Sequence, residues 1–208
     1  MDALLIEVLV QPFLAGAAAP DSLFPKLAAY LELLLKWNAR TNLTSIREPE
    51  EMVRRHFGES LFAALHLPEA DSLLDFGSGG GFPGLPIQLW RPSLAVTLAE
   101  SQNKKATFLR EVVRTLGLVT EVWAQRVEAM PANRQFDVVA LRAVDQMEQA
   151  IAAAAPRARR TLLLMTTEKQ ADPQVEGFAI DRRVAMPKRQ EAVSGKRSGQ
   201  QIVILRRI

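Results

Sequence analysis

One stretch of the chain decides its fold: Ser72-Leu73-Leu74-Asp75-Phe76-Gly77-Ser78-Gly79-Gly80-Gly81-Phe82-Pro83-Gly84. A short apolar run ends in an acid and opens into a glycine-rich turn. This is typical of a buried parallel strand followed by main chain that approaches a ligand closely, because glycine has no Cβ to block the approach. A second apolar run, 94–99, ends in Glu100, about 20 residues further on, where nucleotide sites place an acid for the ribose hydroxyls. We therefore expect a nucleoside-containing cofactor at the carboxyl edge of a parallel sheet.

Strand and helix patterns alternate through the rest of the chain. Strands are predicted over 72–76, 94–99, 119–124, 136–141, 161–166, 178–185 and 201–205, and helices from 84, over 104–116 and over 145–155. Such alternation implies right-handed crossovers and a parallel sheet. The last two strands, joined by a basic loop over 187–199, read as a closing antiparallel hairpin. Residues 69–208 are thus expected to form a Rossmann-like α/β domain with a mostly parallel seven-stranded sheet.

The first part of the chain, 1–68, is predicted to be a helical extension packed on that domain. Ser22 is placed to cap a helix in which apolar residues recur at helical spacing up to Leu35. The segment 37–45 reads as a polar loop, and a further helix is expected from Pro49 toward Leu65.

Composition narrows the function classes. The chain has no cysteine and only two histidines, which argues against disulfides, thiolate nucleophiles and a structural metal. No apolar run reaches the ~18 residues of a membrane span, and the apolar N-terminus lacks the basic start of a secretory signal. A cytoplasmic protein is therefore expected. Residues 181–208 carry eight basic and two acidic residues. This basic end favours a polyanionic partner, although a solvated tail would look the same.

The segment 79–84 also matches the G-x-G-x-x-G pattern of dinucleotide oxidoreductases. Three features argue against that class. Gly77 stands between the acid and the motif, Pro83 lacks an amide donor for a pyrophosphate, and Tyr30, the only tyrosine, lies outside the predicted domain. The loop resembles instead the cofactor loop of class I S-adenosylmethionine-dependent methyltransferases. A plain strand-to-helix turn is the remaining alternative.

Three segments together resemble one methyltransferase family. They are 36–46 (Lys-Trp-Asn-Ala-Arg-Thr-Asn-Leu-Thr-Ser-Ile), 55–60 (Arg-His-Phe-Gly-Glu-Ser) and the glycine loop continued to Pro86. Their order and spacing are similar to those of the glucose-inhibited division protein B family, whose members methylate N7 of a guanine in 16S ribosomal RNA. The resemblance implies S-adenosylmethionine as cofactor and 16S ribosomal RNA or the small ribosomal subunit as partner. No membrane and no obligate protein partner are expected.

The loop pattern and the resemblance give a set of candidate site residues. For the cofactor these are Gly77, Gly79, Gly81, Phe82, Glu100, Val127, Glu128 and Arg142. Arg142 is also the candidate catalytic residue, because the resemblance places it at the reaction centre. The candidate RNA-binding residues are Lys104, Lys105, Arg126, Lys196 and Arg197.

The chemistry of guanine N7 suits a chain with so few nucleophiles. N7 offers a lone pair and has no proton to lose, so the site must align two reactants rather than supply a base. Arg142 would bond guanine O6, anchor a phosphate or the cofactor carboxylate, or form an ion pair with Asp75 or Glu100. A small-molecule methyltransferase and a non-catalytic RNA-binding protein are the competing functions.

Overall fold

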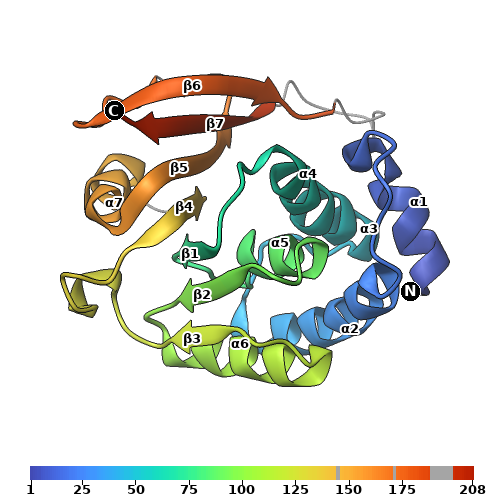
Figure 1. Cartoon of the computed structure of the whole chain (residues 1–208). Coiled ribbons are helices and arrows are strands. Elements are labelled where there is room, and N and C mark those ends of the chain that lie inside the picture. Colours follow the sequence, from blue (N-terminus) through green and yellow to red (C-terminus); the bar gives the residue numbers. More distant parts are fainter. Residues whose placement is uncertain (144–145, 171, 188–198) are drawn as a thin grey trace.

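A seven-stranded sheet forms the centre of the computed structural model, which describes residues 1–143, 146–170, 172–187 and 199–208 (Figure 1). The strand order is β3-β2-β1-β4-β5-β7-β6. The bounds are β1 Ser72–Phe76, β2 Ala95–Ala99, β3 Glu121–Trp123, β4 Phe136–Arg142, β5 Ala158–Thr167, β6 Phe178–Ala185 and β7 Gln200–Arg207. The first five strands pair in parallel, and β7 pairs antiparallel with both β5 and β6. The predicted sheet and its closing hairpin are confirmed.

Two apolar clusters cover the two faces of the sheet because successive strand side chains point to opposite faces. Leu73 belongs to the cluster that also holds the buried side chains of α1, α2 and α4–α6. Leu74, the next residue, belongs to the cluster that holds those of α7. The sheet helices are α5 Gly84–Trp90, α6 Asn103–Leu116 and α7 Met147–Ala154. Figure 1 shows α7 on the side of the molecule away from α1 and α2.

The N-terminal helices share the apolar cluster of the first sheet face. They are α1 Ala3–Leu14, α2 Leu23–Thr41, α3 Pro49–Met52 and α4 Glu59–His66, with the π-helix η1 Val53–Gly58 between the last two. Tyr30, Leu34 and Phe57 of this segment are fully buried in the same cluster as sheet residues. These helices therefore share one continuous core with the sheet.

Two local expectations differ from the structure. The helix α2 continues to Thr41, where a polar loop from residue 37 was predicted. Trp37 stabilises this last turn, because its ring packs 5.8 Å from that of Phe108 and its Nε1 donates to Glu111 Oε2 at 3.0 Å. The helix ends at Asn42, whose φ is +47°. Ser22 does precede α2, but its side chain makes no capping hydrogen bond.

Candidate functional site

A cleft of about 1340 Å³ lies at the carboxyl ends of β1, β2 and β4. Its walls come from the loop after α2, the π-helix η1, the glycine loop, the segment after β3 and the end of β5. Most candidate residues line it: Gly77, Gly79, Phe82, Glu100, Lys105, Arg126, Val127, Glu128 and Arg142. Gly81 and Lys104 are not among the lining residues, and Lys196 and Arg197 lie outside the part of the chain that the structure describes.

The glycine loop turns through left-handed conformations that only glycine adopts without strain. The φ angles of Gly77, Gly79 and Gly81 are +70°, +56° and +89°. A Cβ on Gly79 would meet only Gly77 O, at 3.9 Å, whereas one on Gly81 would lie 2.6 Å from a methyl group of Leu85. Gly79 therefore leaves space on the cleft side of the loop, and Gly81 permits close packing beneath it.

Tyr30 supports the loop from the N-terminal extension. Its hydroxyl donates a hydrogen bond to Gly80 O, and its ring stacks on Phe82 with centroids 5.4 Å apart. Burial raises the pKa of the Tyr30 phenol well above its usual value, so the hydroxyl stays a donor. The sequence placed Tyr30 outside the cofactor domain and missed this role. The available signal was its position on the apolar face of α2.

Glu100 ties the end of β2 to the glycine loop. Its Oε2 accepts a hydrogen bond from Gly79 N at 3.0 Å, and its Oε1 accepts one from Gln102 N at 2.7 Å. The side chain is buried yet lines the cleft. The carboxylate is thus held rigidly at the place where the sequence pattern predicts a ribose contact.

Asp75 lies beneath the loop at the end of β1 and is 1% exposed. Its Oδ2 accepts a hydrogen bond from Gly84 N at 2.9 Å, at the start of α5. Burial raises the pKa of this carboxyl from 3.8 to about 7, although the Gly84 bond acts in the opposite direction. A Cβ on Gly84 would lie 2.8 Å from the same oxygen, so the glycine is required for this contact.

We expect the raised pKa of Asp75 to make the protein less stable as the pH rises. Between the ordinary pKa of 3.8 and the folded-state value of about 7, the folded protein holds a proton that the unfolded chain releases. Stability should therefore fall across pH 4 to 7, by up to about 4 kcal/mol from this group. Asp75→Asn should remove that part of the slope. Urea unfolding of both proteins at pH 4.5 and pH 7.5 measures it, and equal slopes would contradict the expectation.

Arg142, at the end of β4, is held by the N-terminal helices. Its Nη2 donates to Glu59 Oε2 at 2.9 Å and to Arg55 O at 2.5 Å. The guanidinium carbon lies 6.0 Å from the ring centroid of Phe82. The side chain is 10% exposed, and burial lowers its pKa. The ion-pair partner is Glu59 rather than Asp75 or Glu100, because α4 brings a carboxylate that the sheet pattern alone does not place there.

His56 forms the wall between the cofactor loop and the loop after α2. Its ring stacks on Phe82 with centroids 4.6 Å apart, and its Nε2 lies 2.8 Å from Thr44 Oγ1. Burial, with the nearby charges of Arg142 and Arg55, lowers the pKa of His56 to about 3. The imidazole is therefore neutral at neutral pH and acts as an aromatic wall with one hydrogen-bonded edge.

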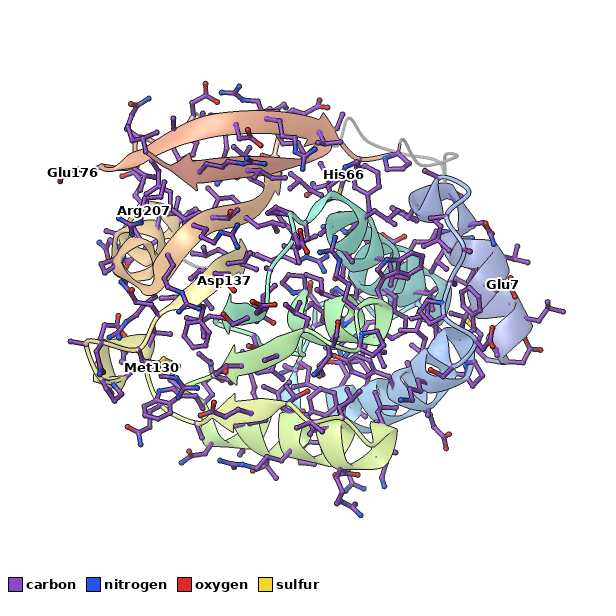
Figure 2. The ribbon with its side chains drawn as sticks, in the orientation of Figure 1. Glu7, His66, Met130, Asp137, Glu176 and Arg207 are labelled. Atoms are coloured by element: carbon purple, nitrogen blue, oxygen red, sulfur yellow. The ribbon has the colours of Figure 1, made fainter. Side chains whose placement is uncertain are left out.

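The segment after β3 is fixed from outside the cleft by Arg157. Val127 and Glu128 begin the short 3-10 helix η2 Val127–Ala129, with Val127 buried and Glu128 exposed. Arg157 donates to four main-chain carbonyls of this region, Val127, Met130, Pro131 and Arg134, at 3.4, 3.0, 2.5 and 3.3 Å. Figure 2 labels Met130 on this segment, far from Glu7 of α1. Arg157 was not predicted, because nothing in its local sequence marks it.

Lys104 and Lys105 stand in the first turn of α6, where Lys105 reaches the cleft and Lys104 is exposed outside it. Arg126 is exposed and lines the cleft from the segment after β3. Within the described ranges no group of three or more His, Asp or Glu side chains is placed to hold a metal ion. Within the same ranges no helix is long and apolar enough to cross a membrane.

Comparison with known families gives one match. The model of a family called GidB, described as rRNA small subunit methyltransferase G, matches residues 24–202. This span includes the cleft and all of its lining residues.

Curated relatives carry the same description. A protein from Chromobacterium violaceum named ribosomal RNA small subunit methyltransferase G is 46% identical over 124 residues, 59% of this chain and 59% of the relative. One from Xylella fastidiosa with the same name is 49% identical over 125 residues, 58% of this chain and 57% of the relative. The chain thus spans about three fifths of the length of the curated relatives it matches.

Solved structures show the fold. Magnesium protoporphyrin IX methyltransferase from Synechocystis, with bound S-adenosylmethionine, aligns at a TM-score of 0.51 and 14% identity, covering 100% of this chain and 98% of that one. The Pyrococcus horikoshii protein TYW2, in complex with MeSAdo, aligns at 0.56 and 14% identity, covering 73% and 62%. The predicted methyltransferase fold class is confirmed.

Proposed function

Since the chain belongs to the rRNA small subunit methyltransferase G family, we propose that it transfers a methyl group from S-adenosylmethionine to N7 of a guanine in 16S ribosomal RNA. The observation that carries this proposal is the arrangement of the cleft. Bare main chain and a fixed carboxylate line one part of the cleft, and an arginine beside the rings of Phe82 and His56 lines another. This confines a nucleoside cofactor and a planar base to one space.

The residues of the cleft fit the cofactor. The space beside Gly79 is open, and the Cβ of any other residue at this position would begin to fill it. Gly77 and Gly79 would face the methionine part, Glu100 the ribose hydroxyls, and Val127 and Glu128 the adenine ring. When bound, S-adenosylmethionine supplies an activated methyl group on a sulfonium sulfur.

The part of the cleft lined by Arg142, His56 and Phe82, here called the acceptor end, fits a guanine that needs only to be held in place. N7 attacks with its own lone pair, so no general base is required, and the lowered pKa of His56, about 3, makes that imidazole a weak base. Arg142 Nη2 bonds Glu59 and Arg55 O, and the other N–H groups of its guanidinium are suited to O6, which lies beside N7 on the same edge of guanine. The contribution of the chain is to exclude water and fix both reactants.

Basic side chains at the rim support RNA as the substrate. Arg47, Lys105 and Arg126 line the cleft from three different segments. We expect the double variant Lys105→Gln/Arg126→Gln to bind 16S RNA more weakly and to reduce the slope of log affinity against log salt by about 1 to 2. Filter binding at several salt concentrations measures both quantities.

The matched control is Arg114→Gln, which removes an exposed charge from the other end of α6. It should leave the salt slope unchanged. If the double variant kept the salt slope of the unaltered protein, Lys105 and Arg126 would not be part of the surface that binds RNA.

The test of the function uses 16S RNA and small subunits from a strain that lacks this methylation. With labelled S-adenosylmethionine we expect one modified guanine, mapped by mass to N7. A small-molecule methyltransferase would leave the RNA unlabelled and bind its substrate independently of salt. A non-catalytic RNA-binding protein would bind the RNA without labelling it.

We further propose that the protein acts in the cytoplasm and without an obligate protein partner.

A further inference from the structure

Two arginines and one carboxylate meet at the acceptor end of the cleft. Glu59 Oε2 lies 2.9 Å from Arg142 Nη2, and Glu59 Oε1 lies 3.2 Å from Arg55 Nε. The exposed fraction of the Glu59 side chain is 6%. All three residues line the cleft. The buried carboxylate of Glu59 is thus shared by two guanidinium groups.

The π-helix η1 makes this meeting possible. Its wider turn lets Glu59 N donate to Arg54 O, five residues earlier. The next two carbonyls are then used by side chains: Arg55 O accepts from Arg142, and His56 O accepts from Ser60 Oγ at 2.5 Å. π-turns within helices are rare, and those that do occur are often found at functional sites. Here it presents Glu59 and the Arg55 carbonyl to the same guanidinium.

The proposed reaction moves positive charge next to the Glu59 carboxylate. In the transfer the S–CH₃ bond breaks and an N7–CH₃ bond forms, the lone pair of N7 makes the new bond, and no proton moves. The positive charge therefore passes from sulfur to the purine ring. Two unpaired guanidinium groups beside that ring would oppose it, because like charges repel strongly where water is excluded.

We propose that Glu59 is a positioning residue for methyl transfer: it holds Arg142 in place at the end of β4 and offsets the charge of both arginines beside the acceptor base. This inference rests on the proposed function. It explains why a residue of the N-terminal extension reaches the reaction centre.

The test is a double-mutant cycle measured on 16S RNA. Glu59→Gln should lower kcat by about 10- to 100-fold, and KM for RNA should stay within about threefold. In the Arg142→Ala background the same change should have a smaller effect, because only the charge of Arg55 is then left unpaired. Affinity for S-adenosylhomocysteine, measured by calorimetry, shows that the variants are folded.

The matched control is Glu50→Gln, which breaks an exposed ion pair to Arg54 with the same four-residue spacing. It should leave kcat unchanged. If Glu59→Gln does not fold, Glu59→Asp keeps the charge at shorter reach and should lower kcat with unchanged S-adenosylhomocysteine affinity.

A wild-type kcat in either Glu59 variant would overturn the inference. So would an equal loss from Glu59→Gln with and without Arg142. Failure of the unaltered protein to methylate N7 would instead overturn the proposed function, so the two failures are distinct.

Discussion

Gly79→Val is expected to abolish binding of S-adenosylhomocysteine while the protein stays folded. The valine side chain would project into the open side of the loop, where only Gly77 O lies within 4 Å of a Cβ. The φ of +56° also strains any β-branched residue, at a cost of about 1 to 3 kcal/mol. We expect affinity to fall more than about 100-fold, equivalent to roughly 2.7 kcal/mol. Calorimetry and urea unfolding measure the two effects separately.

Gly117→Val is the control for backbone strain. Gly117 follows α6 with a φ of +61°, and a Cβ there would meet nothing within 4 Å. It does not line the cleft. This variant should lose a similar amount of stability and keep the affinity of the unaltered protein. If Gly79→Val and Gly117→Val bound S-adenosylhomocysteine with equal affinity, the glycine loop would not contact the cofactor.

Arg142→Ala is expected to lower the rate of methylation by about 100- to 1000-fold, or roughly 3 to 4 kcal/mol of activation free energy. The variant removes a guanidinium group that lines the cleft where we propose that the guanine binds. The loss of stability should be smaller, about 1 to 3 kcal/mol, because Arg55 at 3.2 Å still pairs with Glu59. Single-turnover transfer to 16S RNA and urea unfolding provide the comparison.

Arg159→Ala is the control for a lost ion pair. Arg159 pairs with Asp137 of β4 at 3.1 Å and its side chain is 51% exposed. It should change neither the rate nor, beyond about 1 kcal/mol, the stability. Arg142 would be structural rather than functional if its variant lost rate only in proportion to its loss of folded protein.

The sheet and the cofactor end of the cleft followed from the sequence because they depend on local patterns. Strand β1 was predicted residue for residue, and β6 likewise, since each is bounded by clear turn signals. The glycine loop and Glu100 were found because both stand directly after apolar runs. Strand β1, the glycine loop and Glu100 follow one another within a short stretch of sequence.

The acceptor end was not predictable in the same way because its contacts are distant in sequence. Arg142 and Glu59 are 83 residues apart, and Tyr30 and Gly80 are 50 residues apart. The π-turn that aims Glu59 has no sequence signal distinct from that of an α-helix. Tyr30 and Glu59 both lie on helices of the extension, so their roles depend on how that extension packs on the sheet.

The most direct test is a crystal structure of the protein with S-adenosylhomocysteine. We predict the adenine ring against Val127 and Glu128, the ribose hydroxyls on Glu100, and the sulfur facing the space beside Arg142. The result that would contradict this is a cleft without the ligand, or a ligand whose sulfur points away from Arg142.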